Sequence, residues 1–250
     1  GIWIDFPHLE QKLAAARQRQ PILTDQLVRE LQTVLRLPIP DRFSVGGNAF
    51  THSIPDFETL VRSGVSGIRA RWREGLAQQA RLSEGAEADG AADWLAAVDE
   101  VIGALERYVV RAAAQLRASG APEALCRVFE SELQTGATGL YGAMALFNFF
   151  WYLDDCDSIG RLDSWMRRYY EADLVSDVQI LAWLEELWRN VDLCNGWHMV
   201  VGGHSAPDRA EYSHFTVLVL RSLGKYRRPN AGLLVDPEMP EECWEAVFDN

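Results

Sequence analysis

The chain has 250 residues, and 48% of them are apolar, so it can bury a sizeable core as one large domain or two small ones. Acidic side chains outnumber basic ones by 36 to 24, and the net charge of −12 argues against a nucleic-acid backbone or an anionic membrane as partner. The longest apolar run, Tyr141 to Leu153, is too short to cross a bilayer, so no membrane-spanning segment is expected.

The N-terminal part of the chain has a helical pattern interrupted by loops. Apolar residues recur at helical spacing from Leu9 to Leu37, which predicts one or two helices broken at Pro21. The stretch from Asp41 to Pro55 carries glycines, an asparagine and a proline, so it is predicted to be a loop, and His52 lies in it. On sequence alone His52 is more often a hydrogen-bonded surface histidine than a functional one.

Two further helices are predicted on either side of an acidic connection. Helical spacing returns from Asp56 to Leu76, where Gly64 indicates close packing against another segment. The stretch LSEGAEADG, Leu82 to Gly90, is small, acidic and glycine-bearing, so we expect a mobile loop there. A long amphipathic helix follows from Trp94 to Leu116.

The chain is organised around the stretch FNFFWYLDDCDSIGRLDSWMRRYY, Phe147 to Tyr170. Upstream, Leu140 to Leu153 is apolar at nearly every position, which predicts a buried element approached by the closely spaced glycines Gly136, Gly139 and Gly142. If it is a helix, the aspartates after Leu153 lie at its negative end, which is unfavourable. Arg161, just before an amphipathic helix, is the nearest group that could compensate them.

The acidic turn at this junction has two interpretations. In the first, Asp157 or Ser158 caps the second helix and Arg161 pairs with a neighbouring carboxylate. In the second, the polar groups clustered at the end of an apolar element line a ligand site.

The C-terminal part alternates strands with helices. A helix capped by Ser176 or Asp177 is predicted to end near Val191. Strand and helix then alternate over four segments, which are Trp197 to Gly203, Ala210 to Leu223, Ala231 to Val235 and Pro240 to Phe248. This order predicts two parallel strands, whose apolar outer edges would lie open. We therefore expect the sheet to be incomplete.

Four blocks of the sequence are similar, in order and spacing, to the glycyl radical enzymes, the pyruvate formate-lyase-like family. The blocks are THSIPDFETLVRSGVSGIRA (Thr51 to Ala70), DSIGRLDSWMRRYYEADL (Asp157 to Leu174), HMVVGG…DRAEYSHFTVLVL (His198 to Leu220) and RPNAGLLVDPEMPEECWEAV (Arg228 to Val247). They resemble the N-terminal portion of the family only. The resemblance implies a mainly α fold with a small α/β part, in which residues 1–195 are mostly helical and residues 196–250 begin the strand–helix units of an incomplete ten-stranded α/β barrel.

The resemblance also implies a radical mechanism for the complete enzyme. In the family, an activating enzyme that uses S-adenosylmethionine and an iron–sulfur cluster installs a glycyl radical, which oxidises a cysteine to the thiyl that attacks the substrate. This sequence contains neither the glycyl motif nor a cysteine at the thiyl position, so no catalytic residue and no metal ligand is assigned. Adjacent carboxylates would make Cys156 a poor nucleophile.

What the resemblance carries over is part of a small-molecule substrate pocket. By position in the matching blocks, the substrate-binding residues would be His52, Asp155, Cys156, Asp157, Ser158, Arg161 and Asp163. The complete enzyme would be a homodimer and would also bind its radical-activating enzyme. The dispersed cysteines, with no CxxC pair, favour a reducing, cytoplasmic setting.

Two other functions compete with this partial lyase, dehydratase or formate acetyltransferase-like enzyme. One is a non-catalytic small-molecule-binding protein derived from the same fold. The other is a class I terpene synthase-like protein, in which the aspartates between Trp151 and Asp157 would bind magnesium. His198, His204 and His214, with Cys194, match no metal-ligand spacing and are interpreted as scattered side chains.

Overall fold

A computed structural model describes residues 54–82, 87–154, 158–194, 196–206 and 209–249. The predicted helices between Leu9 and Leu37, and the loop that carries His52, lie outside the described residues. The first described elements are α3 (Phe57–Leu82), α4 (Glu87–Ala118), α5 (Glu123–Arg127), the π-helical turn η2 (Val128–Glu132) and α6 (Leu133–Thr135). They are followed by α7 (Leu140–Leu153), α8 (Leu162–Ala172) and α9 (Asp177–Leu193), and then by the C-terminal strands and helices.

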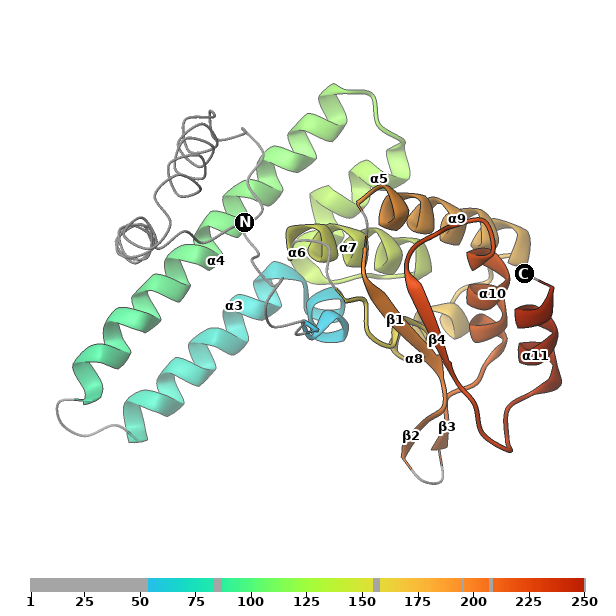
Figure 1. The fold of residues 1–250 in the computed structure, drawn as a ribbon. Coiled ribbons are helices and arrows are strands. Elements are labelled where there is room, and N and C mark those ends of the chain that lie inside the picture. The colour runs from blue at the N-terminus through green and yellow to red at the C-terminus, as the bar shows by residue number, and fades with distance from the viewer. Residues whose placement is uncertain (1–53, 83–86, 155–157, 195, 207–208, 250) are drawn as a thin grey trace, which may run out of the picture.

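Helices α3 and α4 lie side by side and form an arm that projects from the rest of the structure (Figure 1). Arg69 on α3 joins them, because its guanidinium lies 2.7 Å from the carboxylates of both Asp99 and Glu106 on α4. The two predicted helices are confirmed and are longer than expected. The loop predicted from Leu82 to Gly90 is too long, because α4 already begins at Glu87.

Two glycines let α3 cross the segment after α6 at backbone contact. Gly64 has a φ of 60°, which kinks α3, and Gly136 has a φ of 101°. A Cβ on Gly136 would lie 2.0 Å from the Arg62 carbonyl oxygen, and one on Gly64 would lie 2.6 Å from that of Gln134. The close approach expected at Gly64 and Gly136 is confirmed, whereas Gly139 and Gly142 meet carboxylate side chains instead.

The centre of the core is α7, as its continuous apolar sequence predicts. Its fully buried side chains include Leu140, Leu146, Phe147 and Trp151, each with 0% of its surface exposed. The Phe147 ring packs edge-on against Phe57 of α3, with the ring centroids 5.0 Å apart. Because α7 also contacts η2, α8 and α9, it is the element against which the other helices pack.

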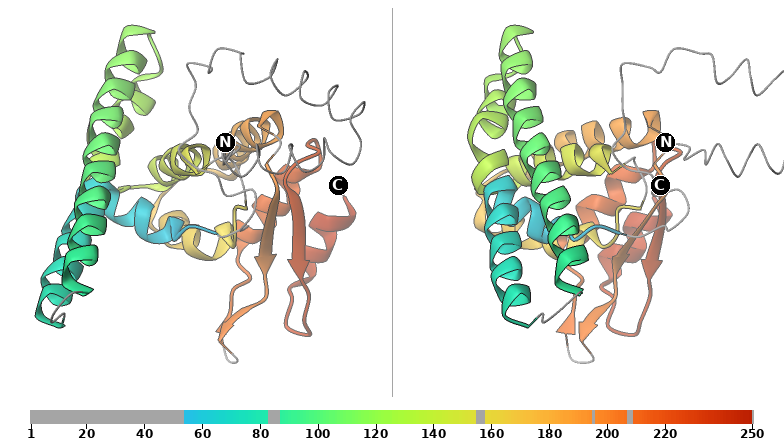
Figure 2. Two further views of the ribbon diagram at one scale, coloured as in Figure 1. Left: turned by 60° about the vertical axis from the view of Figure 1, so that its left-hand side comes forward. Right: turned by 90° about the vertical axis from the view of Figure 1, so that its left-hand side faces the viewer.

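The C-terminal part contains the predicted parallel pair of strands. Strand β1 (His198–Gly202) pairs with β4 (Asn230–Leu234), in a register that places His198 opposite Asn230 and Gly202 opposite Leu234. Helix α10 (His214–Leu223) lies between the two strands in sequence, and α11 (Glu241–Phe248) follows β4. Figure 2 shows α10 and α11 on the same side of the two strands.

The segment between β1 and α10 differs from the prediction. The helix expected from Ala210 begins at His214, because Ser213 caps it and exchanges hydrogen bonds with Thr216 in a capping box. The residues before it form a short antiparallel hairpin of β2 (His204–Ala206) and β3 (Arg209–Ala210). A hairpin this short and polar has no apolar alternation that would reveal it in the sequence.

Strand β4 forms an exposed edge of the described sheet. Met199 and Val201 of β1 are fully buried, but no residue of β4 is. The side chain of Leu234 is 45% exposed and that of Val235, which follows the strand, is 55% exposed. The open apolar edge expected beside β4 is therefore present within the described residues, whereas the outer edge of β1, also expected to be open, is paired with Gly160. No helix in the described part of the chain combines the length and apolar character needed to cross a membrane.

The contact at Gly136 generates a stability prediction. Gly136→Ala should lower the free energy of unfolding by about 2 kcal/mol or more, because the added Cβ collides with the Arg62 carbonyl and the backbone keeps a left-handed φ. The matched control is Gly75→Ala, at an exposed helical position where a Cβ meets nothing within 4 Å, and it should stabilise by about 0.5–1 kcal/mol. Urea unfolding measures both, and equal effects would contradict the backbone contact.

Candidate functional site

The segment from Ser158 to Asp163 connects the buried α7 to α8 and runs beside β1. Ile159 N donates a hydrogen bond to His198 O at 2.8 Å, and Val200 N donates one to Gly160 O at 3.0 Å. These bonds use the edge of β1 opposite β4, so Ile159 and Gly160 add a third, very short parallel strand. Ser158, just before it, is buried with 7% of its surface exposed.

Arg161 and Asp163 both bind the glycine turn that ends β1. The Arg161 guanidinium donates to the carbonyl oxygens of Gly202 and of His204, the latter at 2.9 Å. The Asp163 Oδ2 accepts hydrogen bonds from Gly202 N at 2.9 Å and from the Thr216 hydroxyl on α10, also at 2.9 Å. The two side chains therefore connect α8, β1 and α10.

The turn needs this support because its backbone conformation is unusual. Gly202 and Gly203 have φ values of 72° and 79°, in the left-handed region that favours glycine. A Cβ on Gly202 would lie 2.5 Å from the ring of Tyr212, so glycine is also required by the space available.

Asp163 is a buried carboxylate with 0% of its surface exposed. Burial raises the pKa of Asp163 above its ordinary value of 3.8, although the hydrogen bonds from Gly202 and Thr216 and the charge of Arg161 act in the opposite direction. Its Oδ1 atom has no hydrogen-bond partner among the described residues. Since no surface of Asp163 is accessible, its contribution to a site is to position the turn.

A second polar cluster lies at the carboxyl ends of β1 and β4. His204 Nε2 is 3.1 Å from Asp236 Oδ2, and the Tyr212 hydroxyl is 2.8 Å from the same oxygen. Burial, followed by the hydrogen bond to Asp236, raises the pKa of Tyr212 to about 12, so the phenol stays protonated at neutral pH. Sequence analysis missed this cluster. The signal was available, because His204 and Asp236 each follow a predicted parallel strand, and ligands often bind at that edge.

The structure corrects the local interpretation of the acidic turn. The N-cap position of α8 is occupied by Arg161, and no side chain makes a capping hydrogen bond there. Ser158 is therefore not the cap. Arg161 binds backbone carbonyls some forty residues away in sequence, where the prediction expected a neighbouring carboxylate. His52, Asp155, Cys156 and Asp157 lie outside the described residues, so their predicted contact with a ligand stays a prediction.

The remaining cysteines and histidines are dispersed in the described part of the chain. Cys126 and Cys243 are buried, and burial raises the pKa of the Cys243 thiol, which disfavours the reactive thiolate. His214 pairs with Asp177 at 2.8 Å, whereas His204 pairs with Asp236. No group of three or more His, Cys, Asp or Glu side chains able to bind a metal occurs among these residues.

Comparisons with known proteins agree with this geometry. A family described as pyruvate formate lyase-like matches residues 43–249. The glycerol-bound form of the B12-independent glycerol dehydratase from Clostridium butyricum is similar in structure, with a TM-score of 0.67 and 19% identity over 78% of this chain and 29% of that chain. A glycyl radical enzyme from Archaeoglobus fulgidus gives a TM-score of 0.63 and 15% identity, over 77% and 30% of the two chains. No curated protein matches the sequence.

Removing the Asp163 carboxylate tests its structural role. Asp163→Ala should lower the free energy of unfolding by about 3 kcal/mol, because it leaves the Gly202 amide buried without an acceptor and removes the acceptor that lies 2.9 Å from the Thr216 hydroxyl. Asp163→Asn retains a carbonyl oxygen as acceptor, so it should lower the free energy of unfolding clearly less than Asp163→Ala does. Chemical denaturation of both variants measures the difference, and equal losses would show that the hydrogen bonds do not matter.

The raised pKa of Asp163 predicts a pH dependence of stability. A carboxyl whose folded pKa is above its unfolded value binds its proton more tightly when folded, so its contribution is complete below 3.8 and is lost as pH rises through the folded pKa. The wild-type protein should therefore lose stability relative to Asp163→Asn as pH rises from about 4, and the difference should then level off. Urea titrations across this range test it, and a difference independent of pH would contradict the raised pKa.

Proposed function

This chain belongs to the pyruvate formate lyase-like family, and from that membership we propose that it supplies the N-terminal helical region and the first barrel strand–helix units of a glycyl radical lyase or dehydratase. In this proposal residues 1–195 form the helical part and residues 196–250 begin the barrel. The chain spans under a third of the length of the two solved structures described above.

The observation that carries the proposal is the parallel β1–β4 pair with its exposed edge. Two parallel strands bury too little surface to be stable alone and normally belong to a larger sheet covered on both faces. Leu233 and Leu234 of β4 are only partly covered among the described residues. A further parallel strand beside β4 would cover them and would continue the sheet toward a barrel.

The proposed substrate pocket is the region that follows α7. Ser158 emerges beside the amino end of β1, and we assign its hydroxyl to hydrogen bonding with a small polar substrate, together with His52 and the turn from Asp155 to Asp157. Arg161 and Asp163 are assigned as positioning residues, because both Nη atoms of Arg161 and the Oδ2 atom of Asp163 bind the turn after β1.

The radical chemistry is assigned to the complete enzyme. There a glycyl radical, installed by an S-adenosylmethionine and iron–sulfur activating enzyme, would generate the thiyl that abstracts a substrate hydrogen. The residues of this chain would contribute binding, orientation and exclusion of water, which protects radical intermediates. A cytoplasmic homodimer is part of the same proposal.

Of the competing functions, only one remains. Membership of the family removes the terpene synthase-like alternative, because a parallel pair of strands, one of which ends in a glycine turn, does not belong to that fold. The remaining alternative is a non-catalytic binding protein with the same fold, and a radical measurement separates it from the enzyme.

The radical itself is the direct test of the proposed function. The complete gene product that contains this chain, incubated without oxygen with an S-adenosylmethionine-dependent activating enzyme, should give the electron paramagnetic resonance signal of a glycyl radical. If the gene encodes no glycyl motif and no thiyl cysteine after Asn250, and no signal forms, the catalytic proposal is wrong. Stabilisation of residues 1–250 by a ligand would then support the binding protein.

The substrate role of Ser158 predicts a kinetic effect. In the activated enzyme, Ser158→Ala should lower kcat/KM by about tenfold, because one neutral hydrogen bond to the substrate is lost. Ser119→Ala is the matched control, since that hydroxyl binds Leu116 O at 2.9 Å at the end of α4, and it should leave kcat/KM unchanged. Equal kinetics for wild type and Ser158→Ala would remove Ser158 from the pocket.

A further inference from the structure

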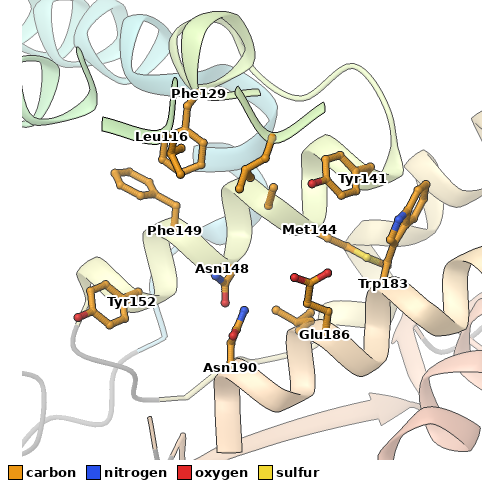
Figure 3. A pocket seen from close by; sticks show the side chains of 13 residues that line it. Leu116, Phe129, Tyr141, Met144, Asn148, Phe149, Tyr152, Trp183, Glu186 and Asn190 are labelled. Carbon is orange, nitrogen blue, oxygen red and sulfur yellow. The ribbon is translucent and has the colours of Figure 1, made fainter. Parts of the chain in front are cut away.

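A cavity of about 250 Å³ lies between α7 and α9, and residues of η2, α5 and the end of α4 also line it (Figure 3). Its walls are mainly apolar and aromatic, and they include Leu116, Phe129, Tyr141, Met144, Phe149 and Trp183. The volume is just below the range of about 300–1,000 Å³ that is usual for drug-sized ligands, so the cavity suits a small metabolite.

The polar lining of the cavity includes one buried hydrogen-bond acceptor that the described residues leave without a partner. Asn148 Oδ1 is buried and has no hydrogen-bond partner among the described residues. Leaving such an acceptor unpaired costs about 1–3 kcal/mol, so a donor from a bound molecule would be favourable. The Glu186 carboxylate points toward the cavity from α9, and Asn190 lies one turn further along the same helix (Figure 3).

The charge of the cavity is negative. Among the described residues that line it, Glu186 is the one charged side chain, and none is lysine or arginine. Burial is the main cause that raises the pKa of Tyr141, which lies on the opposite wall. The negative charge of Glu186 raises this pKa further. The Tyr141 and Trp183 rings lie with centroids 5.2 Å apart, and aromatic faces also attract cations.

We propose that this cavity binds a protonated primary amine with a short apolar tail. The ammonium group would donate hydrogen bonds to Asn148 Oδ1 and to the Glu186 carboxylate, while the tail packs against Phe129, Met144 and Phe149. A carboxylate or phosphate ligand would meet Glu186 with no positive charge to offset the repulsion. A neutral alcohol would fill the apolar part of the cavity, but it could not form the hydrogen bond between a positively charged donor and the Glu186 carboxylate. This site does not depend on the proposed radical chemistry.

The experiment compares three probes of equal length on the full gene product. Isothermal titration calorimetry should show that n-hexylammonium binds about fivefold or more tightly than n-hexanol and that hexanoate does not bind detectably. The proposal is overturned if hexanol binds as tightly as hexylammonium, because the cavity would then be a purely apolar site. It is also overturned if none of the three probes binds.

Substitutions in the cavity wall test whether hexylammonium binds in this cavity. Glu186→Gln should weaken hexylammonium binding about fivefold and leave hexanol binding unchanged. Glu185→Gln is the matched control, because the neighbouring carboxylate instead pairs with Lys225 at 2.6 Å, and it should bind hexylammonium as the wild type does. Asn148→Leu should also weaken hexylammonium binding. Wild-type affinity in Glu186→Gln would overturn the assignment, and because Glu186 is exposed this variant is expected to fold.

Discussion

The buried carboxylate of Asp163 is the contact on which the arrangement of the C-terminal part depends. One oxygen accepts hydrogen bonds from the Gly202 amide of β1 and from the Thr216 hydroxyl of α10, and Asp163 itself belongs to α8. Burying a charge is unfavourable, and it is tolerated here because Arg161 and two donors compensate it. Three elements far apart in sequence are thereby fixed around one backbone turn.

This contact connects an apolar body to a sheet with an exposed edge. The body is built on α7, most of whose side chains are buried, and the segment after it runs along β1 before α8 begins. Ser158 is consequently fixed at one end of β1 and the glycine turn at the other, with His204 and Asp236 just beyond it. In the proposed enzyme, this part of the chain would contribute the rigid placement of these strand ends.

The sequence predicted those elements whose signal is local. The continuous apolar run from Leu140 to Leu153 and the alternation of strands and helices after Trp197 both identified elements that the structure contains. Interactions between distant residues were not predictable in this way. Sequence proximity suggested that Arg161 binds a carboxylate, but its partners are carbonyl groups that only the fold brings near. Likewise Asn148, a single polar residue in an apolar run, gave no indication that it lines a cavity.

The most direct test of the central role of Asp163 is hydrogen exchange at the Gly202 amide. The account predicts that this amide exchanges as slowly as the amides of α7, because its hydrogen bond to a buried carboxylate breaks only when the structure opens globally. Exchange as fast as that of exposed loop amides would show that the turn opens locally, and would contradict the view that Asp163 fixes the end of β1.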